Sequence, residues 1–339
     1  MHQVWSRKKV KISLRTQPLT NGKTPHAESP ILCCHIIVAE AAVYKNYTMI
    51  KNDNMHFGVN GNRVLRLAGF GNHLTDHFNE FGRGYLMASV YGVDLAVEAS
   101  QLSPENFGED AALIWPEVGI RLNMDTLSGV YSKRQSRLGA GVIECDFNNN
   151  PNSFSIVWKP DFFNEMVYDL VVESYAEDSV SASDLRENRR LDSLDFNTCA
   201  CCRRRGERIR NHTADHPVSV ILQGLVGDET TPEFHVSNGC VDMVCAWRIE
   251  EVSNWAGEVT CIGKEHILCI DVSMIHTMQV YTMVRKGREF SILRCYHSLG
   301  GMMLEMSVAG DKYAVLWHRI CSADSSNYSS SGNNTPYVG

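Results

Sequence analysis

The sequence contains no run of about 18 or more apolar residues, the minimum length for a helix that crosses a bilayer. The nearest candidate, residues 31–43, is short and is interrupted by cysteine, histidine and glutamate. A secretory signal joins a basic segment directly to an apolar one, whereas here three prolines separate the two. We therefore expect no membrane partner and an intracellular location, either cytoplasmic or nuclear.

Several familiar catalytic motifs are also absent. There is no glycine-rich phosphate loop ending in Lys-Ser or Lys-Thr, no Gly-x-Ser-x-Gly elbow and no set of kinase signatures. Gly69 and Gly71 follow an apolar run, but the third glycine of a dinucleotide-binding fingerprint is missing. These absences argue against nucleotide-dependent chemistry of the familiar kinds.

The composition nevertheless allows a buried core. The 339 residues are 44% hydrophobic and 21% charged, which is typical of a globular protein. The formal net charge of -7 argues against general coating of nucleic acid, although local basic patches can still bind it. The 12 cysteines are too sparse for a disulfide scaffold, and several lie in strand-like runs. We therefore expect reduced thiols in a cysteine-rich intracellular protein.

Apolar and polar residues alternate along several segments, most clearly in 117–124, 153–158, 241–250 and 302–308. Such alternation gives a strand one buried face and one wet face, as in an antiparallel sheet. Turn signals such as Asn238-Gly239 recur between the later runs. The pattern predicts a mainly β fold with a β-sandwich, jelly-roll or barrel-like antiparallel core and a few helices. An α+β fold is the alternative.

Helical signals are fewer. Pro160 and Asp161 open a helix, Asn72 is a suitable N-cap for a second one that stops near Gly82, and 183–194 is a weak charged candidate. The helix after Pro160 is expected to bury one broad apolar face, made of Phe162, Phe163, Met166, Val167, Leu170 and Val171.

Changes in composition divide the chain into five segments, and no internal repeat of structural length is found. The basic first segment is open to three interpretations: an inert tail, a nucleic-acid-binding arm or a transit peptide. The predicted organisation is a basic disordered arm at 1–30, an α+β region at 31–178, a charged linker with a Cys/Arg/His-rich loop at 179–216, an antiparallel β domain at 217–321 and a disordered tail at 322–339.

The most distinctive segment lies in the predicted linker, where cysteines and histidines are closely spaced. Zinc is held by four such ligands in tetrahedral geometry, although the usual Cys-x-x-Cys spacing is missing here. An exposed basic loop with incidental cysteines is the alternative interpretation. The candidate zinc ligands are Cys199, Cys201, Cys202, His212 and His216.

Arginines lie between these candidate ligands, and guanidinium groups on a metal-pinned loop would contact phosphate. The leading hypothesis is therefore a non-enzymatic binding or assembly protein of viral type that contacts nucleic acid or an acidic protein partner. Exposed strand edges also favour self-association. The candidate nucleic-acid contacts are Arg203, Arg204, Arg205, Arg208 and Arg210, together with Lys8 and Lys9 in the arm.

The alternative hypothesis is an enzyme, namely a metal-dependent hydrolase or phosphodiesterase. On a helix from Asn72, the side chains of His73, His77 and Glu80 share one stripe, which is a familiar way to hold a catalytic metal. Leu74 stands where a zinc protease has its general-base glutamate. The competing interpretation is a half-buried helix with a polar edge, so the sequence leaves open whether the protein is an enzyme.

Overall fold

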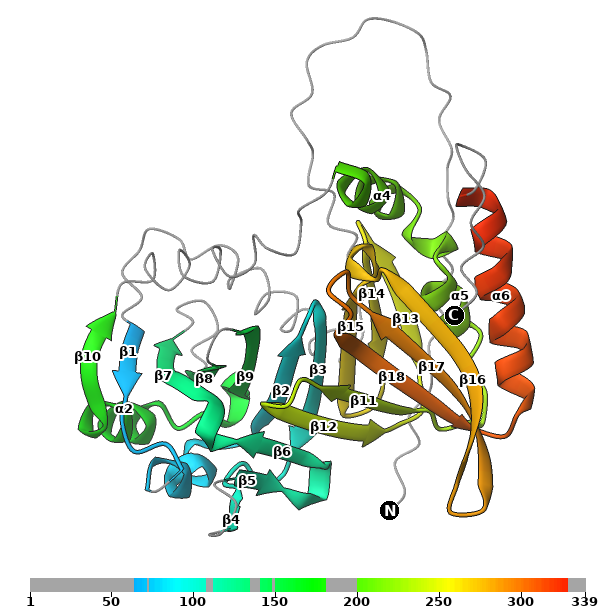
Figure 1. Cartoon of the computed structure of the whole chain (residues 1–339). Coiled ribbons are helices and arrows are strands. Elements are labelled where there is room, and N and C mark those ends of the chain that lie inside the picture. The colour runs from blue at the N-terminus through cyan, green and yellow to red at the C-terminus, as the bar shows by residue number, and fades with distance from the viewer. Residues whose placement is uncertain are drawn as a thin grey trace, which may run out of the picture. The chain divides into compact units, whose positions relative to one another are not determined.

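We describe the protein from a computed structural model that covers residues 64–71, 73–107, 112–134, 141–147, 150–180 and 200–328. These residues form two antiparallel sheets and a few helices, which confirms the predicted mainly β fold (Figure 1). None of the helices in this part of the chain is long and apolar enough to cross a membrane. The predicted arm at 1–30 and the weak helix at 183–194 lie outside the described residues.

The first sheet, called here the ten-stranded sheet, has the strand order β10-β1-β7-β8-β9-β2-β3-β15-β14-β13. All of its neighbouring strands are antiparallel. Its strands are β1 Val64–Leu67, β2 Gly84–Val90, β3 Val93–Ala99, β7 Leu127–Arg134, β8 Gly141–Phe147, β9 Asn150–Trp158, β10 Ala176–Val180, β13 Glu251–Trp255, β14 Glu258–Ile262 and β15 His266–Asp271.

The second sheet, called here the eight-stranded sheet, has the order β16-β17-β18-β11-β12-β6-β5-β4 and is also antiparallel throughout. Its strands are β4 Glu105–Phe107, β5 Ala112–Trp115, β6 Ile120–Asn123, β11 Glu233–Ser237, β12 Val241–Ala246, β16 Thr277–Arg285, β17 Arg288–Tyr296 and β18 Met302–Ala309.

The helices are short, apart from the last one, which continues into the predicted tail at 322–339. The α-helices are α2 Glu165–Ser174, α4 Ala200–Asn211, α5 Pro217–Gln223 and α6 Lys312–Tyr328. The 3-10 helices are η1 Leu74–Phe81, η2 Pro116–Val118, η3 Met124–Thr126, η4 Pro160–Phe162, η6 Thr213–Asp215 and η7 Val272–Met274.

The two halves of the chain repeat one arrangement of strands. Each half has a hairpin (β2–β3 or β11–β12), a three-strand unit (β4–β6 or β13–β15), a three-strand meander (β7–β9 or β16–β18) and a helix (α2 or α6), in that order. In each sheet the meander pairs with the hairpin of its own half, and the hairpin pairs with the three-strand unit of the other half. The expectation that the chain has no internal repeat is therefore wrong.

This exchange of three-strand units joins distant parts of the sequence. Val93 of β3 pairs with Ile270 of β15, and Ile120 of β6 pairs with Met243 of β12. Each sheet thus contains strands from both sides of the segment 179–216, where the sequence predicts a domain boundary. The boundary itself stays a prediction.

One hydrophobic core includes the inner faces of both sheets. Leu86 and Leu95 contribute from the ten-stranded sheet, and Phe234 and Met306 from the eight-stranded sheet, all of them fully or almost fully buried. Because side chains alternate along a strand, the residues between these positions point to the outer face of each sheet. The outer faces are therefore where polar side chains can gather.

Helix α2 corrects one prediction about the core. Its buried residues are Tyr168, Val171 and Val172, whereas Met166 and Leu170 are exposed. The orientation follows from Tyr168, whose hydroxyl donates to the carbonyl of Val142 at 3.0 Å inside the protein. Only one side of this short helix faces the core, so the broad apolar face expected after Pro160 cannot be buried as a whole.

Candidate functional site

Residues 200–223, in which the sequence predicted a metal-binding loop, form α4, η6 and α5. Helix α5 begins at Pro217, which suits the first position of a helix because it needs no N–H donor there. His216 is extended, with φ -65° and ψ 135°, as a residue before proline must be. Arg205 donates from Nη1 to the carbonyl oxygen of His276 at 3.1 Å, which ties α4 to the start of β16.

His216 is the most deeply buried of the predicted metal ligands that the structure describes, with 2% of its surface exposed. Its Nδ1 accepts a hydrogen bond from the backbone N–H of Val218 at 3.3 Å and so caps α5. Burial, reinforced by the positive charge of Arg205, lowers the pKa of His216 to about 4. The imidazole is therefore neutral at physiological pH, with its proton on Nε2.

The other predicted zinc ligands do not complete a site around His216. His212 is exposed and places Nδ1 3.7 Å from the carboxylate of Asp215. Cys201 and Cys202 lie in the first turn of α4, and Cys199 lies outside the described residues. Within the part of the chain that the structure describes, no three histidine, cysteine or acidic side chains are placed to hold a metal ion.

The predicted arginine contacts lie on α4. Arg204, Arg208 and Arg210 are exposed, Arg203 belongs to the same helix, and Arg205 is partly buried against His276. Lys8 and Lys9 lie outside the described residues. The structure thus arranges these arginines along a helix rather than on a loop held by a metal.

The predicted His/His/Glu stripe falls on η1. His77 places Nδ1 3.3 Å from Oε1 of Glu80, while His73 is exposed at the N-cap position. A 3-10 helix has three residues per turn, so residues three apart face each other and His73 lies out of line with that pair. Its buried side consists of Leu74, Thr75, Phe78 and Phe81.

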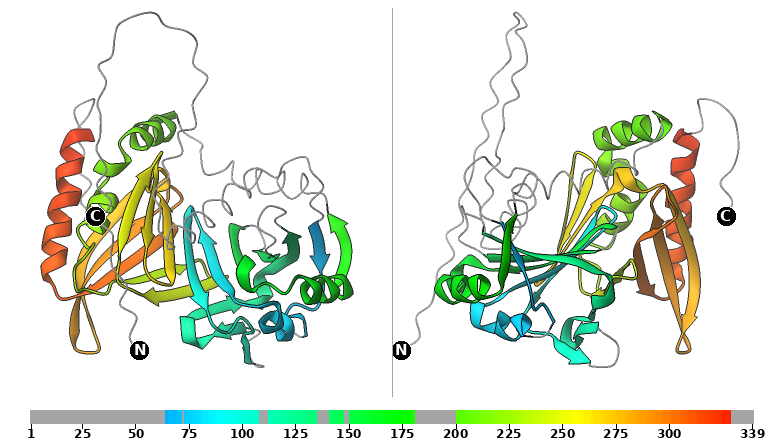
Figure 2. Two further views of the ribbon diagram at one scale, coloured as in Figure 1. Left: turned by 180° about the vertical axis from the view of Figure 1, so that it is seen from behind. Right: turned by 60° about the vertical axis from the view of Figure 1, so that its left-hand side comes forward.

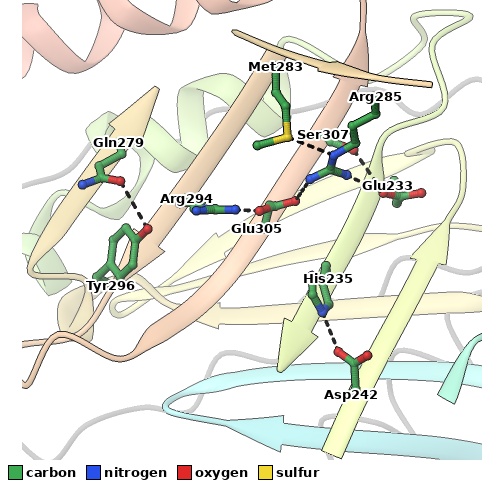
Figure 3. Close-up of polar contacts among 10 residues, drawn as sticks. All are labelled: Glu233, His235, Asp242, Gln279, Met283, Arg285, Arg294, Tyr296, Glu305 and Ser307. Atoms are coloured by element: carbon green, nitrogen blue, oxygen red, sulfur yellow. Dashed lines mark hydrogen bonds and ion pairs between the residues drawn. The ribbon is translucent and has the colours of Figure 1, made fainter. Parts of the chain in front are cut away.

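A polar cluster that the sequence did not predict lies on the outer face of the eight-stranded sheet (Figure 3). Nε2 of His235 on β11 is 2.5 Å from Oδ1 of Asp242 on β12. This hydrogen bond raises the pKa of His235 and lowers the pKa of Asp242. Asp242 lies directly opposite Ser237 across the hairpin, so the side chains of His235 and Asp242 are diagonal neighbours. The Asn238-Gly239 turn was the sequence signal that fixed this register.

Beside this pair, two arginines share one buried carboxylate (Figure 3). Nε of Arg294 is 2.6 Å from Oε2 of Glu305, and Arg285 forms an ion pair with the other oxygen of Glu305. Arg285 also reaches Oε1 of Glu233 at 3.4 Å. Burial alone would raise the pKa of Glu305, but the hydrogen bonds from the two arginines bring it below its ordinary value.

No known family model matches the sequence, and no curated protein sequence matches it. Solved structures do share its fold. A structure of the Escherichia coli O157:H7 heme degrading enzyme ChuS superposes with a TM-score of 0.54 at 10% identity, covering 84% of this chain and 99% of ChuS. Holo-PhuS, a heme-binding protein from Pseudomonas aeruginosa, superposes with a TM-score of 0.55 at 10% identity, covering 81% of this chain and 94% of PhuS.

A further structure of ChuS, described as an E. coli heme oxygenase, has a TM-score of 0.53 at 11% identity and covers 83% of this chain and 94% of that one. At such identities the likeness establishes the fold alone. The fold is nevertheless that of proteins described as binding or degrading heme.

These likenesses overturn the predicted function. A viral-type assembly protein that contacts nucleic acid is wrong, and so is the alternative of a metal-dependent hydrolase built on His73, His77 and Glu80. The predicted zinc cofactor is also wrong, because the neighbours are described as heme proteins and the described residues hold no metal-binding cluster. The error arose because cysteine and arginine content was interpreted without knowing that residues 200–211 are helical.

Proposed function

We propose that this protein binds heme. The observation that carries the proposal is the two-repeat fold with exchanged strands, which matches ChuS over 84% of this chain and 99% of that one with a TM-score of 0.54. PhuS, described as a heme-binding protein, matches to a similar extent. A likeness over nearly the whole of both solved proteins supports a shared ligand class more strongly than a likeness of one common sheet would.

The chain's own residues fit a heme iron. Histidine is a common axial ligand of heme iron, and it coordinates as the neutral imidazole. His216 is held neutral across physiological pH, with a pKa of about 4. The guanidinium of Arg205 contributes to that low pKa, and a guanidinium is suited to the carboxylates of heme. His216 and Arg205 are therefore the residues that would hold the iron and one carboxylate.

His235 is the weaker candidate for the iron. The hydrogen bond to Asp242 raises its pKa, so a proton competes with iron for this ring more strongly than for an ordinary histidine. Its Nε2 is also occupied by Asp242 at 2.5 Å. For these reasons His216 is the residue that would hold the iron.

Binding requires two local changes. His216 is 2% exposed, so iron could reach the ring only after a local rearrangement around it. If His216 held the iron through Nε2, the ring proton would move to Nδ1, and the hydrogen bond from Val218 that caps α5 would be lost. Bound heme would supply an iron centre for ligand binding or oxygen chemistry, while the protein supplies the neutral imidazole, the cation and the apolar surroundings.

We further propose that the protein acts inside the cell. The proposal rests on the buried free cysteines, such as Cys145 and Cys261, which suit a reducing compartment. The bacterial origin of ChuS and PhuS gives no support to the nuclear location that the sequence left open.

The proposal is tested by titrating the purified full-length chain with hemin and following the Soret band. We expect saturation at one hemin per chain. His216→Ala should weaken binding by about 100-fold or more, because the loss of even an outer-shell partner costs up to that amount in metal affinity. His318→Ala, which removes an exposed histidine on α6, is the matched control and should bind like the wild type.

Two failures are distinguishable. If the wild-type chain shows no saturable change in the Soret band, the proposed function is wrong. If it binds hemin and His216→Ala binds equally well, the function stands and the assignment of the iron ligand is wrong.

A further inference from the structure

Helix α2 exposes large apolar side chains on the side that faces away from the core. Met166 is 80% exposed and Leu170 is 71% exposed, four residues apart on one side of the helix. Phe162, at the end of η4, is also 54% exposed, and the Arg83 guanidinium lies 5.5 Å from the centroid of its ring. Isolated apolar residues are common on protein surfaces, but neighbouring ones that are this exposed indicate an interaction site.

The row on α2 has an acidic border. Glu165, Asp169 and Glu173 follow one another at four-residue spacing directly beside Met166 and Leu170. The helix contains no lysine or arginine. We call this surface, formed by Phe162, Met166 and Leu170 with the three acidic residues, the α2 ridge. A partner of the α2 ridge must therefore be apolar at its centre and positively charged at its border.

The counterpart helix of the second repeat has these properties. On α6, Val315 is 59% exposed and Leu316 is 53% exposed. Lys312 and Arg319 lie on the same side, three to four residues away, and both are exposed. We call this surface the α6 ridge. Beneath it the helix is anchored in the core, where Trp317 is 1% exposed.

The two ridges cannot meet within one chain. Helix α2 packs against η1 at the end of the first repeat, whereas α6 packs against α5, β16 and β17 of the second. Figures 1 and 2 show α2 and α6 at opposite ends of the described part of the chain in every view. Complementary surfaces at opposite ends can be joined only between molecules.

We propose that the α2 ridge of one copy docks on the α6 ridge of a second copy. The apolar rows lie against each other, and the carboxylates of Glu165 and Glu173 face the cations of Lys312 and Arg319. The contact is head-to-tail rather than two-fold symmetric, since each copy uses a different surface at each end. Association therefore extends beyond a dimer, into open chains or closed rings. The proposal is independent of heme.

The test compares variants of the full-length chain by analytical ultracentrifugation. The wild type is expected to gain mass with concentration, past the dimer. Met166→Ser with Leu170→Ser removes the α2 ridge, and Val315→Ser with Leu316→Ser removes the α6 ridge. Each double variant should associate at least about tenfold more weakly, the effect of losing about 1.4 kcal/mol. Val284→Ser with Leu299→Ser removes equally exposed apolar residues elsewhere and should associate like the wild type.

Mixing the two ridge variants distinguishes the head-to-tail contact from other ways in which two copies could associate. Each variant retains the surface that the other lacks, so an equimolar mixture should form a one-to-one dimer and nothing larger. Thermal unfolding monitored by circular dichroism confirms that the variants are folded, as expected for exposed positions. A wild type that stays monomeric at all concentrations overturns the proposal. So does a closed dimer that survives either variant, or a mixture that stays monomeric.

Discussion

His216 combines two properties that rarely occur in one side chain. Its ring caps α5 by accepting the N–H of Val218 at 3.3 Å, and it is buried beside the positive charge of Arg205. Helix capping is usually done by a residue such as asparagine. Burial beside a positive charge keeps the imidazole neutral. Together they make this histidine a sensor of acid conditions in the absence of heme.

The stability of the protein should therefore fall at acid pH. The unfolded chain binds a proton on His216 below about pH 6.5, whereas the folded chain binds it only near pH 4. Stability contributed by the neutral ring is thus complete above pH 6.5 and is lost as the pH falls from 6.5 to 4. The loss amounts to about 3 kcal/mol at the lower limit.

His216→Asn keeps a good capping oxygen but cannot titrate in this range. We expect the variant to lose about 2 kcal/mol less than the wild type between pH 7.5 and pH 4.5, measured by urea denaturation at both values. Equal losses in His216→Asn and in the wild type would show that this ring does not titrate as described.

For single residues, the sequence showed which side chains matter better than it showed what they do. His216 was chosen as a metal ligand, and the heme proposal uses it, but the zinc partners assigned to it lie elsewhere. Arg294 and Glu305 were missed, because their meeting with His235 depends on the register of three strands. A register can be worked out for a hairpin with a defined turn, but not for β11 and β18, which are about 70 residues apart.

Among the elements, α2 shows how a single side chain orients a helix. The Tyr168 hydroxyl lies 2.7 Å from Ser132 Oγ and donates to Val142 O at 3.0 Å, so it connects α2 to β7 and β8. Its ring packs edge-on against Phe81 and Trp158. The α2 ridge is exposed because this opposite side is anchored.

Tyr168→Phe should weaken this anchor without changing the packing of the ring. The buried carbonyl of Val142 and the hydroxyl of Ser132 each lose a partner, which costs about 2 kcal/mol in the free energy of unfolding. Urea denaturation measures the change. Tyr296→Phe removes a hydroxyl that donates to Gln279 at the surface at 3.2 Å, and it should cost less than about 0.5 kcal/mol. A Tyr168→Phe variant as stable as this control would show that α2 is held by apolar contacts alone.

The sequence identified most elements but not how they face the core. Alternation in 241–250 and 302–308 predicted β12 and β18 within a few residues. Pro160 begins only the short 3-10 helix η4, and the predicted helix starts later, at Glu165 after the N-cap Asn164. Its exposed and buried sides were not distinguished either, because an apolar residue looks the same in a core and at an interface. The segment 200–211 gave no helical signal beyond its arginines, and cysteines drew attention to metal binding instead.

For the whole molecule, the repeat was invisible in the sequence because the two halves share strand order rather than residues. Periodicity predicts that a segment is a strand, but it does not say which strand becomes its neighbour. The units β4–β6 and β13–β15 each pair with the hairpin of the other half, so their position depends on contacts between the halves. No local pattern in either half encodes it.

Dividing the chain within 181–199 tests how far the halves depend on each other. Each half alone lacks the three-strand unit that completes its sheet, so we expect neither to unfold cooperatively when produced separately. Co-expressed halves should co-purify as a one-to-one complex with a cooperative thermal transition. Two separately folded halves, each with its own cooperative transition in circular dichroism, would support the domain boundary predicted from the sequence.

The exchanged strands also mean that paired strands are synthesised at very different times. During synthesis β3 leaves the ribosome early, but its neighbour β15 begins only at His266. At the usual pace of translation, the about 170 residues between Val97 and His266 take roughly 10 to 30 s to make. For that interval the edge of β3 has no strand beside it, and a newborn chain is open to pairing with the wrong partner. Faithful production of this protein therefore depends on protection of an unfinished sheet.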